Sequence, residues 1–182
     1  MLLFIVKCIY LMLPGIFANM MPVLMRKHWK FLDYPVDFNL KWRDGEPLLG
    51  THKTWRGLIA GTLVAIGVVA IQKVLIDQSF FENLSILPYQ DYSVWLVGFL
   101  IGFGVLFGDM VKSFFKRRFK IKPGDKFIPW DQIDSVLGAL IFISFVWFPP
   151  WSLIFTLLIL SFLLHIIVRH LGYYLKVNKK KW

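Results

Sequence analysis

The chain has 182 residues, of which 57% are hydrophobic and 18% aromatic, and its formal net charge is +10. Soluble domains usually hold about 45–50% apolar residues, so this composition excludes an ordinary soluble protein. The lone Cys8 excludes a disulfide framework. Five segments approach the roughly 20 apolar residues that cross a hydrocarbon core. The sequence therefore predicts an all-α integral membrane protein with five transmembrane helices in a single domain, residues 1–182. These spans lie at about 1–25, 57–76, 93–111, 132–148 and 151–168.

The first span resembles a cleaved signal peptide in its position and hydropathy. Lys7 interrupts the apolar run, however, and Pro14 and Pro22 suit a kinked helix that stays in the membrane. We therefore expect a helix here.

Charge along the chain predicts the orientation of these spans. Almost all of the 21 Lys and Arg residues lie in the loops 26–56 and 112–131 or after the last span. The connection 77–92 has no Lys or Arg and carries three acids. The positive-inside rule then predicts an outside amino terminus, with both basic loops and the carboxyl terminus in the cytoplasm. We expect a multi-pass protein of the cell membrane, and topology alone accounts for part of the positive charge.

The segment DGEPLLGTHKTWRG, residues 44–57, ends where the second span begins. Lys53, Thr54 and Arg56 offer donors at a helix start, where an anion is readily held, and we predict that they bind a substrate phosphate. Basic residues required by topology, with Thr54 as a helix cap, explain the same pattern equally well. His52 is expected to be a surface histidine.

The third span contains glycines at 98, 102, 104 and 108, including two pairs spaced four residues apart. Such spacing lets another helix approach closely, and we expect Gly98 and Gly102 to serve this packing. Gly108 directly precedes an acid.

The third span ends in GDMVKSFFKRR, residues 108–118. Helical geometry places Asp109, Lys112, Ser113 and Lys116 on one face, with Arg117 beside them. Asp109 at the edge of a membrane core needs a partner or a metal ion. For the terminal bases, Arg118 above all, the alternative is that they reach to the lipid headgroups. Ser113 either orients a phosphate oxygen or bonds back to its own helix.

A second group of acids follows in FIPWDQIDSVLGAL, residues 127–140. Asp131 falls in the first helical turn, where a carboxylate also stabilises the positive end of the helix dipole. Asp134 shares a face with Asp131, and one helix start does not need two acids. Because the fourth span is short, we expect its charged end to dip into the bilayer around a polar cavity open to the cytoplasm.

These residue types together predict the ligand. Magnesium prefers oxygen ligands and completes its shell with substrate phosphates, while Lys and Arg neutralise phosphate oxygens. We predict Mg²⁺ held by Asp109, Asp131 and Asp134, with a nucleoside triphosphate bound beside it. The chain has no Walker-type P-loop, and its Cys and His residues lack zinc-site spacing. A small transporter is the alternative from another class, although no internal repeat supports it.

GDMVKSFFKRR followed by PWDQIDSVLGAL resembles the signature of the membrane cytidylyltransferases that form CDP-alcohol lipids, most closely the CDP-archaeol synthase branch. DGEPLLGTHKTWRG is similar to the first cytoplasmic loop of that branch. The resemblance implies transfer of CMP from CTP to 2,3-bis-O-geranylgeranylglycerol 1-phosphate, giving CDP-archaeol and pyrophosphate for polar lipid biosynthesis. CTP, this isoprenoid lipid and membrane lipids are the implied partners. No nucleic-acid partner is expected, and the oligomeric state is left open.

In the larger phosphatidate cytidylyltransferases, two acids that match Asp109 and Asp131 hold the metal ions. The resemblance therefore implies metal ions at these two residues. From their charge, we expect Lys112, Lys116 and Arg117 to stabilise the triphosphate and the leaving pyrophosphate. The interval between the two acids is shorter in this chain, and DKFIPW replaces a glycine-rich segment of the larger enzymes. Phosphatidate is disfavoured as the substrate but stays an alternative.

Overall fold

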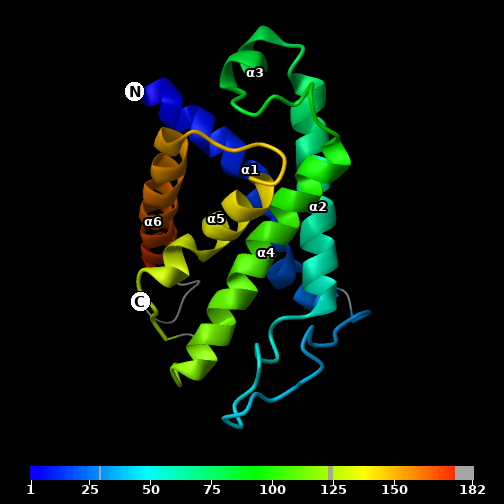
Figure 1. Cartoon of the computed structure of the whole chain (residues 1–182), viewed down its shortest axis with the longest axis vertical. Helices are drawn as coiled ribbons and strands as arrows, with labels where there is room; N and C mark the ends of the chain where they lie inside the picture. The colour runs from blue at the N-terminus through cyan, green and yellow to red at the C-terminus, as the bar shows by residue number, and fades with distance from the viewer. Residues whose placement is uncertain (29, 123–124, 175–182) are drawn as a thin grey trace.

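The computed structural model describes residues 1–28, 30–122 and 125–174, and this part of the chain folds into six helices (Figure 1). They are α1 (Leu2–His28), α2 (Trp55–Leu75), α3 (Ser79–Leu84), α4 (Val94–Arg118), α5 (Trp130–Ile143) and α6 (Trp151–Tyr174). The basic tail from residue 175 onwards lies outside the described residues.

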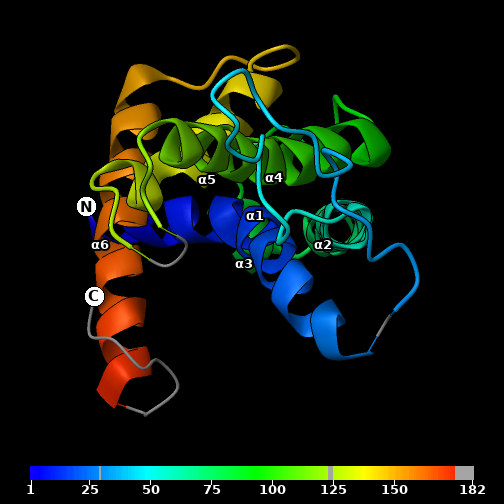
Figure 2. The same ribbon diagram turned by 90° about the horizontal axis from the view of Figure 1, so that it is seen from below.

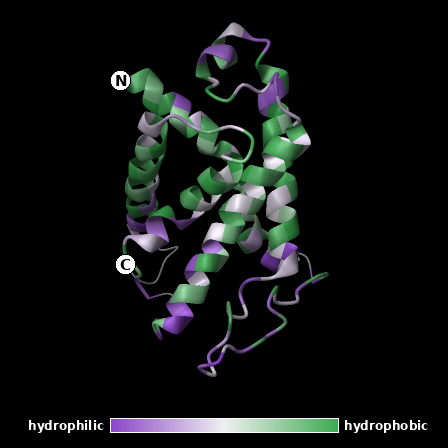
Figure 3. Cartoon of the chain, viewed as in Figure 1, coloured by the Kyte–Doolittle hydropathy of each residue, from purple (hydrophilic) through white to green (hydrophobic). Residues whose placement is uncertain are grey.

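Four of these helices are long and apolar enough to cross a membrane, over Leu2–Arg26, Trp55–Leu75, Val94–Arg118 and Trp151–Leu171. Figure 3 shows hydrophobic residues along the middle of the long helices and hydrophilic residues towards both ends of the molecule, including the end of α4 at the lower end and α3 at the upper end. The prediction of an all-α membrane protein is confirmed.

The fourth expected span, 132–148, differs from the observed helix. α5 has 14 residues, and its length of about 21 Å falls short of the roughly 30 Å hydrocarbon core. After Ile143 the chain runs without regular helix to Trp151, where α6 begins. Pro149 and Pro150 disfavour helix in the residues before them, which hydropathy alone does not reveal. The short helix α3 in the connection 77–92 was not predicted.

α4 is the central helix of the molecule. It packs against α2, α5 and α1, whereas α6 packs mainly against α5 at the edge of the bundle (Figures 1 and 2). The amino terminus, α3 and the start of α6 lie at one end of the molecule (Figure 1). The end of α4 and the long connection between α1 and α2 lie at the other, which we call the polar end.

Glycines allow the backbones around α4 to touch. A Cβ at Gly102 would lie 2.6 Å from the Ala65 Cβ on α2, and one at Gly98 would collide with Ile66 on the same helix. The expected packing role of Gly98 and Gly102 is thereby confirmed. Gly108 faces α5, where a Cβ would collide with the Asp134 carbonyl oxygen. Direct backbone contact therefore fixes how Asp109, the acid of α4, lies against the acids of α5.

We expect Gly138→Ala to lower the thermal stability of the protein. Gly138 on α5 packs against the backbone of Gly104 and Gly108, and a Cβ there would collide with the Gly104 carbonyl oxygen. Such overpacking costs typically about 1–3 kcal/mol. Gly67→Ala on α2 is the matched control, because nothing lies within 4 Å of its Cβ position. Thermal unfolding in detergent measures both, and equal melting temperatures would contradict this contact between α4 and α5.

Candidate active site

The connection between α1 and α2 is folded around a buried acid, Asp37. Its carboxylate accepts hydrogen bonds from the backbone N–H groups of Leu49 at 2.8 Å, Gly50 at 3.3 Å and Asn39 at 3.1 Å. These bonds close residues 37–50 into a compact loop that leads the chain to Lys53. Sequence reasoning missed Asp37, although an Asp that bonds two residues ahead is a common turn signal.

Arg118 fastens this loop to the end of α4. Its Nε lies 3.1 Å from Asp44 Oδ2, its Nη2 donates to the Pro47 carbonyl at 2.7 Å, and its guanidinium lies 4.9 Å from the centre of the Phe114 ring. The expectation that Arg118 reaches to lipid headgroups is wrong, because loop acceptors and an aromatic face engage the guanidinium. The loop is therefore held beside α4.

Of the three donors predicted to bind substrate phosphate before α2, the structure brings Lys53 to Asp109 on α4. Thr54 caps α2 by accepting a hydrogen bond from the Gly57 N–H at 3.3 Å. The guanidinium of Arg56 is buried and pairs with Asp33 at 2.8 Å. Thr54 and Arg56 thus secure the start of α2, and their binding of substrate stays a prediction.

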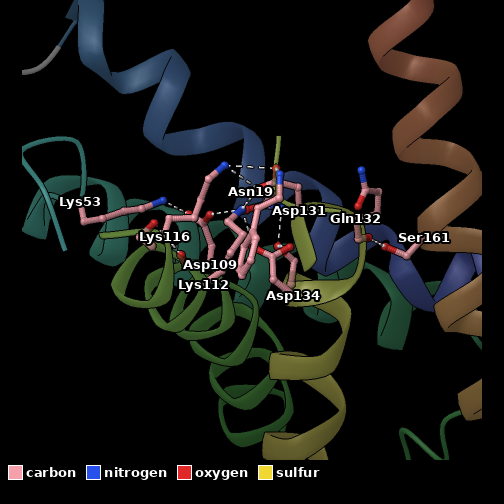
Figure 4. A network of polar contacts seen from close by, with 12 residues as sticks. Asn19, Lys53, Asp109, Lys112, Lys116, Asp131, Gln132, Asp134 and Ser161 are labelled. Carbon is pink, nitrogen blue, oxygen red and sulfur yellow. Dashed lines mark hydrogen bonds and ion pairs between the residues drawn. The ribbon is translucent and has the colours of Figure 1, made fainter. Parts of the chain in front are cut away.

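Three lysines and three aspartates meet at the polar end of α4 and α5, and we call them the lysine–aspartate cluster (Figure 4). Its members are Lys53, Asp109, Lys112, Lys116, Asp131 and Asp134. The sequence predicts every member as a site residue. It also predicts that Asp109, Lys112 and Lys116 share one face of α4.

Lys112 is the centre of the cluster. Its Nζ lies 3.0 Å from Asp109 Oδ1, 2.7 Å from Asp134 Oδ2 and 3.6 Å from Asp131 Oδ1. Lys53 approaches the other side of Asp109 and pairs with its Oδ2. One ammonium group thus contacts carboxylate oxygens from both helices.

Lys116 holds the other side of Asp131. Its Nζ lies 3.0 and 3.1 Å from the two carboxylate oxygens and also donates to the Asp125 carbonyl at 2.6 Å. Asp131 Oδ2 in turn accepts from the Phe127 N–H at 2.7 Å. Asp131 therefore orders the start of α5 as well as contributing charge.

A polar cavity of about 310 Å³ opens beside the cluster. Five of its lining residues come from the cluster, and Ser113, Arg117, Thr51 and His52 also line it. Ser113 donates to the Asp109 carbonyl at 2.9 Å, so its hydroxyl bonds back to α4. The buried Nε of Arg117 has no hydrogen-bond partner among the described residues. His52 is exposed, as expected, and lies at this cavity.

The predicted magnesium ligands are brought together with lysines between them. Among the described residues, no three His, Cys, Asp or Glu side chains form a ready metal site. Asp109, Asp131 and Asp134 nevertheless each place an oxygen within 3.6 Å of the Lys112 ammonium. A donor set of carboxylates that converges on one cation suits Mg²⁺. The residues fit the metal if Lys112 turns away from them.

Asp134 is also supported from the far side of α5. Asn19 on α1 donates to the Ser135 hydroxyl at 2.9 Å, and that hydroxyl lies 3.4 Å from Asp134 Oδ1. On α6, Ser161 donates to the Gln132 carbonyl at 2.6 Å. These contacts join α1 and α6 to the site across long sequence separations. No local sequence pattern predicts these contacts.

Comparison with known proteins identifies the family of the chain. The profile of the family described as CarS-like, CDP-archaeol synthase, matches residues 1–182. CDP-archaeol synthases of Pyrococcus furiosus and Archaeoglobus fulgidus are each 32% identical to the chain, with 98% and 100% of both sequences covered. A solved structure described as an intramembrane enzyme for archaeal membrane lipid biosynthesis aligns with a TM-score of 0.69 at 30% identity. That alignment covers 88% of this chain and 90% of the solved one.

These matches set the transporter alternative aside, because family, relatives and solved structure all point to a lipid-synthesising enzyme. The chain is a multi-pass membrane protein that belongs to the CDP-archaeol synthase family, the CTP-dependent cytidylyltransferases of archaeal membrane lipid biosynthesis.

Proposed function

We propose that the chain transfers CMP from CTP to 2,3-bis-O-geranylgeranylglycerol 1-phosphate at the lysine–aspartate cluster, giving CDP-archaeol and pyrophosphate. The observation that carries this proposal is the meeting of three carboxylates and three ammonium groups beside one polar cavity. A triphosphate needs such cations around its oxygens.

The polar end faces the cytoplasm in this proposal. The basic connection between α1 and α2 and the basic end of α4 lie together there (Figure 1), and positive loops favour the cytoplasmic side. α5 and the segment 144–150 together make the remaining passage, because the length of α5, about 21 Å, is continued by a turn at 144–146 and by residues 147–150, which reach about 13 Å when extended. CTP then enters the polar cavity directly from the cytoplasm.

Asp109, Asp131 and Asp134 would hold Mg²⁺, which supplies charge screening at the phosphate oxygens. The ammonium of Lys112 turns from these carboxylates to phosphate oxygens as CTP binds. Lys116 and Arg117 line the cavity and neutralise the triphosphate and the leaving pyrophosphate, Arg117 as a planar fork and Lys116 as a point charge. The backbone contact between α4 and α5 keeps the side chains of the two helices at fixed positions relative to one another.

In the reaction, an oxygen of the lipid phosphate forms a bond to the α-phosphorus of CTP. The bond from that phosphorus to the bridging oxygen of the β-phosphate breaks, and pyrophosphate leaves with the electron pair. A general base is unnecessary, because a phosphate monoester with a second pKa of about 6 is already anionic at neutral pH. Catalysis comes from positioning and charge neutralisation.

The direct test offers purified protein each of four α-labelled nucleoside triphosphates with Mg²⁺, together with the geranylgeranyl ether phosphate or phosphatidate. We expect label in extractable lipid from CTP with the ether lipid. Label with phosphatidate alone would overturn the assignment of the ether lipid as the substrate. Folded protein that labels neither lipid from any nucleotide would overturn the proposed reaction.

Lys116→Ala tests the role of the cavity lysines in nucleotide binding. A hydrogen bond to a charged group contributes about 1.5–3 kcal/mol, so we expect KM for CTP to rise at least about tenfold, with a smaller change in kcat. Lys122→Ala is the control, because Lys122 is exposed and does not line the polar cavity. Initial rates over a range of CTP concentrations measure both. Unchanged kinetics in Lys116→Ala would limit Lys116 to holding Asp131 and the Asp125 carbonyl, with no part in nucleotide binding.

A further inference from the structure

A second cavity, of about 390 Å³, lies between α4 and α5, and we call it the apolar groove. Aromatic and aliphatic side chains line it, among them Phe107, Val111 and Phe115 on α4 and Leu137 and Ile141 on α5. Its polar lining consists of two members of the lysine–aspartate cluster, Lys112 and Asp134. The groove is therefore amphipathic, with an apolar body and one charged end.

The body of the groove is open on the side that faces away from the other helices. Phe115 is 45% exposed and Ile141 is 60% exposed. In a membrane protein, exposed apolar side chains on a long helix face lipid. A molecule that already lies in the bilayer can therefore enter the groove sideways.

The charged end of the groove adjoins the polar cavity. Lys112 lines both spaces. On the groove side its Nζ pairs with Asp134 at 2.7 Å, and on the cavity side it pairs with Asp109 at 3.0 Å (Figure 4). The lysine–aspartate cluster thus separates the polar cavity from the apolar groove.

We infer that the apolar groove holds a hydrocarbon chain of the lipid phosphate, whose phosphate lies at Lys112. This inference rests on the proposed function. The occupant must carry an anionic head to meet the ammonium and an apolar chain to match the lining, and a lipid phosphate meets both conditions. CTP and lipid then approach Lys112 from opposite sides. The oxygen of the lipid phosphate reaches the α-phosphorus of CTP beside the lysine–aspartate cluster.

The groove positions the lipid more than it attracts it. A chain in the bilayer is already surrounded by hydrocarbon, so entering an apolar groove gains little hydrophobic free energy. Obstruction should therefore act by keeping long chains out. It should spare a lipid phosphate whose chains are too short to reach the obstructed part.

Ile141→Trp obstructs the groove, and Ile159→Trp on α6 is its matched control. Both isoleucines are 60% exposed, and Ile159 lines neither the groove nor the polar cavity. We expect Ile141→Trp to lower kcat/KM for the full geranylgeranyl ether phosphate at least about tenfold. A short-chain glycerol phosphate ether should lose twofold or less, and the Kd for CTP should stay constant. Ile159→Trp should leave all three unchanged.

Photocrosslinking of the unaltered protein gives an independent readout. A lipid phosphate with a diazirine in its isoprenoid chain is irradiated with the protein in detergent, and the modified peptides are mapped by mass spectrometry. We expect modification of α4 and α5 residues that line the groove, removed by an excess of unlabelled lipid phosphate.

The outcomes separate the groove from the proposed reaction. Equal use of the long-chain lipid by Ile141→Trp and Ile159→Trp, or competed crosslinks confined to other helices, would overturn the groove assignment while the reaction stands. Absence of CTP-dependent product from every lipid, with folded unaltered protein, would overturn the proposed function first.

Discussion

Asp109→Asn is expected to lower CTP-dependent lipid labelling about 10³-fold, the upper end of what removal of one electrostatic element costs an active site. Asp109 pairs with both Lys53 and Lys112. Asn keeps the shape of the side chain but removes the charge that holds both ammonium groups and that would bind the metal. The assay is initial-rate labelling at saturating CTP and lipid.

Asp91→Asn is the matched control for this variant, because Asp91 is exposed in the connection before α4, at the opposite end of the molecule. Its activity should equal that of the unaltered protein. Thermal unfolding of Asp109→Asn in detergent should show a single transition, which separates loss of chemistry from loss of fold. A fully active Asp109→Asn enzyme would remove Asp109 from the reaction centre.

Lys112→Met is expected to have the second large effect, with turnover reduced about 10²–10³-fold. Lys112 contacts all three acids of the cluster, and it lines both the polar cavity and the apolar groove. Met keeps an unbranched chain of similar length without the charge. Removing the ammonium takes from the buried Asp134 the lysine with which it pairs, whereas Asp109 and Asp131 keep Lys53 and Lys116, so the variant should also unfold at a lower temperature.

Lys112→Met should also change how much Mg²⁺ raises the melting temperature of the protein. Without the central ammonium, the three carboxylates lose the cation that they share and can bind Mg²⁺ at its place, while Lys53 and Lys116 still pair with Asp109 and Asp131. Any ligand that binds the folded state raises its stability. We expect Mg²⁺ without nucleotide to raise the melting temperature of Lys112→Met more than that of the exposed control Lys122→Met. An equal response of the two variants would contradict convergence of the acids on Lys112.

The sequence predicted the features that local patterns encode. Helical periodicity placed Asp109, Lys112 and Lys116 on one face, and the structure brings all three into the cluster. The spacing of Gly98 and Gly102 predicted close packing, which the contacts with α2 confirm.

The remaining features depend on long-range contacts or on where a helix stops. Hydropathy continued through the segment after Ile143, so the expected fourth span was longer than α5. The partners of Arg118 lie about 70 residues away in sequence, and Asn19 and Ser135 are separated by 116 residues. The apolar groove arises from the packing of α4 on α5, which no single segment specifies.

The most direct test of the reaction centre is the position of the metal with its nucleotide. A crystal of the protein grown with Mn²⁺ and a non-hydrolysable CTP analogue gives an anomalous peak at the bound ion. We expect the peak within coordination distance of carboxylate oxygens of Asp109 and Asp131, with Lys112 turned to a phosphate. A nucleotide bound in the polar cavity with its metal away from these acids, or a nucleotide bound elsewhere, would contradict the assignment of the lysine–aspartate cluster as the site of cytidylyl transfer.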